Sequence, residues 1–249
     1  RNVTGVQTCA LPIFAKDQAL ELNRSNGEDL KIRPSQPQRT MSLIKFFSTN
    51  GHLDRVDFKG ALLAGQAPDK GLYMPEMFPS LSPETIRNFP QMSYHQIAYQ
   101  VIKPYLGDLV EESALEEMLK DAYSYEVPLE RVYDGKYLLR LDRGPTCSFK
   151  DFAARLMGRL MQYFLKEEGR SMIILTATSG DTGSAVAHAF YGLENIKVIV
   201  LFPEREVTER QRRQMTTLGE NIYPLAVTGK FDDWQVLVKQ AFVDPELKG

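Results

Sequence analysis

Cysteine and histidine are scarce in this sequence, which has two cysteines and three histidines among 249 residues. So few ligands exclude a framework of disulfide bonds and a zinc site built from these residues, and we expect no bound metal. Long apolar runs are also missing, because none approaches the roughly 18 residues that a membrane-spanning helix needs. Neither sign of charge dominates, since 30 Lys and Arg residues face 32 Asp and Glu residues. This balance argues against a dedicated nucleic-acid-binding protein.

The remaining composition is that of an ordinary globular protein. Hydrophobic residues make up 43% and charged residues 25% of the chain, and the formal net charge is −2. These values exclude disorder along the whole chain, and the length suits one large domain or two small ones. We therefore expect a cytoplasmic enzyme or binding domain with no membrane or nucleic-acid partner.

Residues 1–40 do not follow the pattern of the rest. The run from Val3 to Ile13 has neither helical nor strand periodicity, and it resembles the conceptual translation of a sequencing adapter. The polar stretch from Leu20 to Thr40 has little to bury, which is typical of disorder. We interpret residues 1–40 as a non-native or disordered leader and Met41 as the natural start. The alternative is a real but irregular N-terminal tail.

Residues 41–126 are predicted to form a small, mostly helical domain. Ser82 and the proline after it suit the cap and first turn of a helix that runs toward Asn88. Apolar residues recur at helical spacing from Tyr94 to Tyr105 and from Glu112 to Tyr123. The segment from Asp69 to Pro75 is predicted to be a turn that leads into an extended stretch.

From about residue 137 strands alternate with helices, which indicates the α/β fold class. The expected order is strand Lys136–Leu141, helix Lys150–Lys166, strand Met172–Ala177, helix Thr182–Leu193, strand Lys197–Phe202, helix Thr208–Leu218, strand Ile222–Val227 and helix Phe231–Phe242. Four consecutive β-α units with apolar strands predict a parallel sheet covered by helices on both faces. Ligands of such sheets bind beyond the carboxyl ends of the strands, which directs attention to two loops.

The first loop, RGPTCSFKD, spans residues 143–151. Gly144 and the proline after it turn the chain, and Ser148 can cap the helix, which leaves Lys150 in the first turn. The positive end of the helix dipole disfavours the ammonium form, and desolvation would lower the pKa further, as a Schiff-base lysine requires. The alternative is a solvated lysine, the commoner role for a lone one. Cys147 is interpreted as a small apolar residue near the site.

The second loop, TATSGDTG, spans residues 176–183. The hydroxyls of Ser179 and Thr182 lie beside the N–H groups of a helix N-terminus, which suits a carboxylate or a phosphate. The alternative is an ordinary capped helix start. The string DTGS from Asp181 is also found in aspartic proteases, but here it occurs once and opens an alanine-rich helix, so we exclude that class. His188 in the same helix is interpreted as a structural histidine.

Together, GPTCSFKD at 144–151 and ATSGDTGSA at 177–185 resemble the threonine synthase family. KGLYMP at 70–75, QMTTLG at 214–219 and VTGKFDD at 227–233 are similar to further family segments, so the resemblance runs from about Met41 to the C-terminus. Family members are pyridoxal-phosphate (PLP) enzymes of fold type II, the tryptophan-synthase β-like fold. The resemblance implies an N-terminal family domain at 41–126 and the first β-α units of the PLP-dependent parallel-sheet domain at 127–249.

The resemblance also implies a reaction, in which O-phospho-L-homoserine and water become L-threonine and phosphate. Lys150 matches the lysine that holds PLP and then serves as general acid and base, while the cofactor acts as electron sink. Phe149 is expected to pack beside the cofactor. The residues that match the loop holding the substrate carboxylate are Ser179, Gly180, Asp181 and Thr182. A monomer is favoured over an oligomer.

The sequence departs from the family pattern in three respects. Arg143 replaces a histidine found in many relatives and could meet a phosphate group or only solvent, and Cys147 replaces an aliphatic residue. The family's glycine-rich loop for the PLP phosphate has no counterpart before Gly249. We therefore expect a C-terminally truncated fragment that binds PLP weakly and turns over negligibly. The alternatives are another fold type II lyase acting on a phosphorylated or hydroxy amino acid, and a catalytically silent binding domain.

Overall fold

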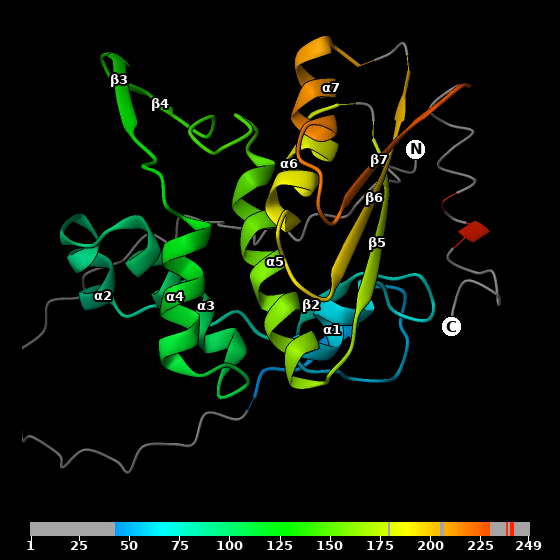
Figure 1. Ribbon diagram of the computed structural model, residues 1–249. Coiled ribbons are helices and arrows are strands. Elements are labelled where there is room, and N and C mark those ends of the chain that lie inside the picture. The colour runs from blue at the N-terminus through cyan, green and yellow to red at the C-terminus, as the bar shows by residue number, and fades with distance from the viewer. Residues whose placement is uncertain (1–42, 179, 205–206, 230–237, 239, 242–249) are drawn as a thin grey trace, which may run out of the picture.

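The computed structural model describes residues 43–178, 180–204, 207–229, 238 and 240–241 (Figure 1). The predictions for residues 1–40 and for Ser179 therefore lie outside the described residues. The helix predicted at 231–242 is described only at Val238, Gln240 and Ala241, and these three residues are helical.

The N-terminal part of the structure is mostly helical, as expected. Its elements are β1 (Phe46–Ser48), α1 (Phe58–Ala64), β2 (Tyr73–Pro75), α2 (Pro83–Asn88), a 3₁₀ turn (Phe89–Gln91), α3 (Tyr94–Leu106) and α4 (Glu112–Ala122). The side chain of Ser82 accepts a hydrogen bond from the N–H of Thr85, which confirms the predicted cap of α2. β1 and β2 pair antiparallel, and β2 occupies the end of the segment from Asp69 to Pro75.

The strand predicted at Lys136–Leu141 is not part of the parallel sheet, and that prediction is wrong. β3 (Leu129–Tyr133) and β4 (Lys136–Leu139) form a separate antiparallel hairpin. Every residue of both strands is exposed, and the hairpin projects from the body of the molecule (Figure 1). Asp134 and Gly135 form its two-residue turn, and Gly135 has a φ of +69°. Asp-Gly between two apolar runs is a strong hairpin signal, so the local turn captures this strand.

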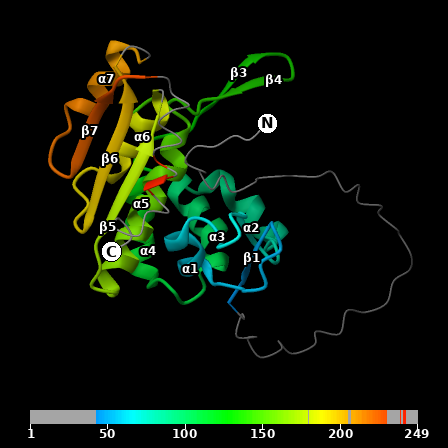
Figure 2. The ribbon, with the colours of Figure 1, turned by 90° about the vertical axis from the view of Figure 1, so that its right-hand side faces the viewer.

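The parallel sheet consists of β5 (Met172–Ala177), β6 (Ile196–Pro203) and β7 (Ile222–Val227), in that order. The helices associated with it are α5 (Lys150–Glu167), α6 (Asp181–Phe190) and α7 (Glu209–Thr216), which lie on one side of the sheet (Figures 1 and 2). β6 pairs with β5 and with β7 in parallel register, so the central strand has a neighbour on each edge.

Helices α5, α6 and α7 cover one face of the sheet, and the helix expected at 231–242 lies mostly outside the described residues, so the expectation of helices on both faces stays a prediction. Ile173, Tyr223 and Leu225 on the face away from these helices are 62%, 46% and 51% exposed. Parallel strands joined through a helix are connected right-handed. Because β5, β6 and β7 follow one another in a single direction, both connecting helices fall on the same face.

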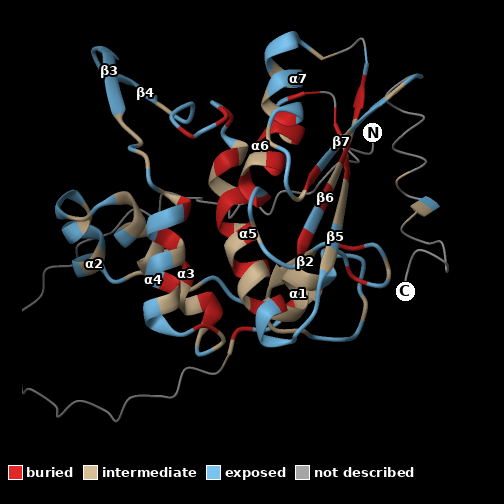
Figure 3. Ribbon diagram, viewed as in Figure 1, coloured by how far each residue is buried: buried red, intermediate tan, exposed pale blue. Residues whose placement is uncertain are grey.

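Helix α5 lies between two apolar cores. Leu156, Leu160 and Phe164 pack in a cluster with α3 and α4, whereas Met161 and Leu165 pack in a second cluster with α6 and the sheet. Buried residues therefore run along the length of α5 (Figure 3). This central packing places the first turn of α5 beside the first turn of α6.

Candidate active site

The first turns of α5 and α6 bring Lys150 and Asp181 together. Lys150 Nζ lies 2.9 Å from Asp181 Oδ2, although the two residues are 31 positions apart. The lysine side chain is 20% exposed and that of the aspartate 57%. Asp181 follows β5, so this ion pair lies at the carboxyl end of the sheet, where ligands of α/β proteins bind.

The ion pair determines the electrostatics of the site. Its hydrogen bond from Lys150 lowers the pKa of the Asp181 carboxyl below 3.8, and a weaker bond from Ser148 acts in the same direction against the effect of burial. Ser148 Oγ donates to Asp181 Oδ2 over 3.3 Å. The lysine therefore has a direct counter-charge, which the sequence argument from the helix dipole had not anticipated.

Phe149 stands next to the lysine amine, as the sequence order suggests. Lys150 Nζ lies 4.6 Å from the centroid of the Phe149 ring, which is a cation–π distance. The phenylalanine itself is 58% exposed. An apolar ring is thus available on the solvent side of the amine.

The start of α6 is capped by a residue that the sequence argument overlooked. Thr178 Oγ1 accepts hydrogen bonds from the N–H of Gly180 over 3.2 Å and of Gly183 over 2.9 Å. Among hydrogen bonds that join two described residues, none uses the N–H of Asp181 or Thr182 as donor. The signal for Thr178 is a hydroxyl residue between a buried strand and a helix start.

Among the described residues, no hydrogen bond or ion pair joins the Lys150 amine to Arg143, Cys147 or His188. Arg143 is half-exposed and its guanidinium lies 3.6 Å from Glu130 in the hairpin. Cys147 is an exposed free cysteine. His188 is partly buried, and burial is the main cause that lowers its pKa. Its Nδ1 is buried without a hydrogen-bond partner among the described residues.

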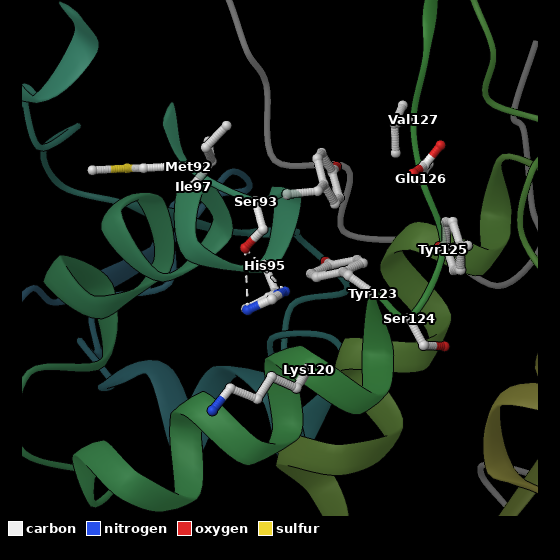
Figure 4. Close-up of a pocket in the computed structure, with 11 residues that line it drawn as sticks. Met92, Ser93, His95, Ile97, Lys120, Tyr123, Ser124, Tyr125, Glu126 and Val127 are labelled. Carbon is white, nitrogen blue, oxygen red and sulfur yellow. Dashed lines mark hydrogen bonds between the residues drawn. The ribbon is translucent and has the colours of Figure 1, made fainter. Parts of the chain in front are cut away.

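A concavity lies between the start of α3 and the end of α4 (Figure 4). Ser93, His95, Lys120 and Tyr123 contribute to its lining. The ring of Phe152 packs edge-on against Tyr94 and Tyr125, two further lining residues. The lining does not include Lys150, so this concavity is distinct from the ion pair at the sheet.

Within the part of the chain that the structure describes, no group of three or more His, Cys, Asp or Glu side chains could hold a metal ion. No helix among the described residues is long and apolar enough to cross a membrane. The described groups at the ion pair are the Lys150 amine, the Asp181 carboxylate, the Ser148 hydroxyl and the N–H groups at the start of α6.

Two protein families match this chain in sequence. Residues 45–123 match the family described as "Threonine synthase N terminus", and residues 127–246 match "Pyridoxal-phosphate dependent enzyme". Threonine synthase from Pseudomonas aeruginosa is 38% identical over 207 residues, which cover 81% of this chain and 44% of that protein. Threonine synthase from Escherichia coli is 37% identical over 205 residues, which cover 82% of this chain and 47% of that protein. The chain thus spans about half the length of these curated relatives.

Solved structures agree with these sequence matches. A PLP-bound threonine synthase from Brucella melitensis superimposes with a TM-score of 0.78 at 39% identity, and the match covers 82% of this chain and 45% of that one. Threonine synthase from yeast superimposes with a TM-score of 0.76 at 28% identity, and the match covers 84% of this chain and 45% of that one. The fold described above is therefore shared with part of these structures.

Proposed function

The chain belongs to the threonine synthase family of pyridoxal-phosphate-dependent enzymes, and from this premise we propose that Lys150 is its PLP-binding lysine. We propose further that the protein serves the conversion of O-phospho-L-homoserine and water into L-threonine and phosphate. The observation that carries this proposal is the primary amine of Lys150, held 2.9 Å from Asp181 at the carboxyl end of the sheet.

The residues at this site fit the cofactor. A primary amine that is one-fifth exposed can be reached by the carbonyl group of PLP, and lysine is the residue that binds it covalently. The Phe149 ring, 4.6 Å from the amine, offers an apolar surface beside an aromatic cofactor. Bound PLP supplies an electron sink for chemistry at the carbons of an amino acid.

The chain's own groups supply positioning and proton transfer. The Lys150 amine can accept and return a proton at the substrate carbons when it is not bound to the cofactor. Asp181 keeps a negative charge beside that amine. The residues proposed to bind the substrate carboxylate are Ser179, Gly180, Asp181 and Thr182. The N–H groups of Asp181 and Thr182 open α6, and a helix N-terminus favours an anion.

We also propose a domain boundary near residue 126, with an N-terminal domain at 41–126 and the PLP-dependent part at 127–249. The two family matches, which end at 123 and begin at 127, support this boundary. The expectations of a cytoplasmic monomer, and of negligible turnover by this chain on its own, stay predictions.

The cofactor assignment is tested by trapping. The chain is incubated with PLP, reduced with borohydride, digested and mapped by mass spectrometry. We expect Lys150 to be labelled about tenfold or more above Lys166, which lies exposed at the far end of the same helix and serves as internal reference. Lys150→Arg should remove the label from this peptide and leave Lys166 unchanged. Equal labelling of the two lysines would contradict the assignment.

The reaction is tested by product analysis. The chain with PLP and O-phospho-L-homoserine is incubated for long times, and the P. aeruginosa relative is assayed in parallel. Threonine and phosphate in equal amounts support the proposal, whereas 2-oxobutyrate in place of threonine supports the alternative lyase on the same fold. Turnover near that of the relative would show that our prediction of negligible turnover is wrong.

A further inference from the structure

The turn that leads into α5 is held by a carboxylate buried beneath it. Asp151, which follows Lys150, is fully buried. Its Oδ2 accepts a hydrogen bond from the N–H of Thr146 over 2.9 Å, and its Oδ1 accepts one from Thr146 Oγ1 over 2.7 Å. Both carboxylate oxygens are thus used by one residue of the turn, and that residue is itself 8% exposed.

The backbone of this turn is tightly constrained around the carboxylate. A Cβ atom at Gly144 would overlap with the carboxylate of Asp151, so the chain can pass here only as glycine. Cys147 has a φ of +59°, a left-handed conformation that is uncommon for residues with a side chain. Such a conformation persists only where surrounding contacts impose it. The two hydrogen bonds from Thr146 to Asp151 are contacts of this kind.

The same turn determines where the lysine amine lies. Ser148 Oγ accepts a hydrogen bond from the N–H of Lys150 and donates one to Asp181 Oδ2, each over 3.3 Å. The carbonyl of Ser148 accepts from the N–H of Asp151 over 3.0 Å. Ser148 therefore links the two partners of the ion pair, and its own position depends on the turn that Asp151 holds.

A positive charge accompanies the buried carboxylate. Arg155 lies one helical turn after Asp151 on α5 and is 6% exposed. Its Nε donates to the carbonyl of Ala122 at the end of α4 over 2.7 Å. A buried carboxylate is retained where hydrogen bonds and an opposite charge surround it. The hydrogen bonds from Thr146 meet the first requirement, and the guanidinium of Arg155, whose own ion pair is with Asp121, supplies an opposite charge one helical turn away.

We propose that Asp151 is a positioning residue for Lys150, which it places beside Asp181 by holding Thr146 and hence the turn from Gly144 to Ser148. This inference rests on the proposed function, in which Lys150 holds the cofactor. Among the described residues, Asp151 makes no hydrogen bond to the Lys150 amine, because both of its carboxylate oxygens accept from Thr146. Its effect on Lys150 passes through the turn.

The inference is tested on the full chain with two substitutions at one position. Thr146→Val keeps the shape of the side chain and removes the hydroxyl donor to Asp151, while Thr146→Ser keeps the donor and serves as matched control. Asp151→Asn tests the other partner of the same contact. Each variant is labelled separately with acetic anhydride and with PLP plus borohydride, and labelling at Lys150 is expressed relative to Lys166. Circular dichroism melting shows that each variant is folded.

We expect opposite effects with the two reagents. In Thr146→Val the amine leaves Asp181 and becomes more open to solvent, so relative acetylation of Lys150 should rise about threefold or more, while relative PLP labelling falls by a similar factor. Thr146→Ser should stay within about twofold of the parent with both reagents. A merely structural role would change the melting temperature without moving the two ratios in opposite directions.

The outcomes separate this inference from the proposed function. If both ratios in Thr146→Val equal those in Thr146→Ser, the positioning role of Asp151 is overturned, whatever the parent binds. If the parent shows no preference of PLP for Lys150 but acetylation still rises in Thr146→Val, the positioning role stands and the cofactor assignment fails. If Asp151→Asn does not fold, the comparison of Thr146→Val with Thr146→Ser tests the positioning role by itself.

Discussion

The ion pair between Lys150 and Asp181 joins two residues that sequence reasoning had given separate tasks. The lysine was expected to hold the cofactor and the aspartate to help bind the substrate. In the structure the carboxylate lies 2.9 Å from the amine, so any substrate carboxylate near Asp181 would meet a site in which this negative charge is already balanced. At the scale of single residues, the pair is the feature most open to direct measurement.

The pair predicts a pH-dependent contribution to stability. The hydrogen bond from Lys150 lowers the folded-state pKa of Asp181 below 3.8, so the contribution is present above that pH and disappears as the pH falls through the folded-state pKa. Asp181→Asn should lower the free energy of unfolding at pH 7 by less than about 1 kcal/mol, because the aspartate is more than half exposed. Urea unfolding of parent and variant at pH 7 and at an acid pH below 3.8 measures the difference.

The control for this prediction is Asp108→Asn, which changes an exposed aspartate far along the chain. The effect of Asp181→Asn, measured relative to this control, should shrink in acid. A constant difference for Asp181→Asn across this range would show that the ion pair does not stabilise the fold.

At the scale of elements, the hairpin β3–β4 is where local and long-range preferences compete. The apolar run at 136–141 suits a strand of the parallel sheet, and only its neighbours decide its partner. Asp134 and Gly135 form a two-residue turn, so β3 lies next to β4 along the chain. Pairing these two strands therefore costs little loop-closure entropy. The periodicity correctly identified a strand and could not identify its partner.

The turn of the hairpin gives a prediction about local stability. Gly135→Val should destabilise the hairpin by about 1 kcal/mol, because a β-branched residue fits poorly at a φ of +69°. Global unfolding should change little, since every residue of both strands is exposed and adds little to the core. Hydrogen exchange at the amides of β3 and β4 should become faster, while exchange in α5 stays the same.

Gly135→Asn provides the matched control, because asparagine tolerates the left-handed conformation better than valine. Its exchange rates should lie close to those of the parent. If both variants left the exchange of the hairpin unchanged, the turn would not be what holds the two strands together.

At the scale of the whole molecule, α5 connects the N-terminal helices to the sheet. One side of this helix belongs to the core with α3 and α4, and the other side to the core with α6 and the strands. Because Lys150 opens the same helix, the position of the amine depends on the packing of both cores. This arrangement also means that the two parts should lose their structure together.

Phe164 tests this coupling. Its side chain is fully buried in the cluster with α3 and α4. Phe164→Ala should lower the free energy of unfolding by about 3–5 kcal/mol, as large-to-small changes in a core do. Phe78→Ala, at a position that is 54% exposed, should cost less than about 0.5 kcal/mol. Denaturation followed by circular dichroism measures both, and hydrogen exchange in β6 should become faster only in Phe164→Ala.

From the amino-acid sequence alone, helices α2 to α7 and the three strands of the parallel sheet could be predicted, and Lys150 could be proposed as a site residue. Those features depend on periodicity, caps and short motifs, which act over a few neighbouring residues. Tertiary structure alone decided that β4 pairs with β3 and that Asp181 faces Lys150 across 31 positions. It also decided that Asp151 holds the turn through Thr146. The contact between Lys150 and Asp181 depends on how α5 and α6 pack side by side. The distance between the starts of two helices cannot be predicted from a local sequence pattern.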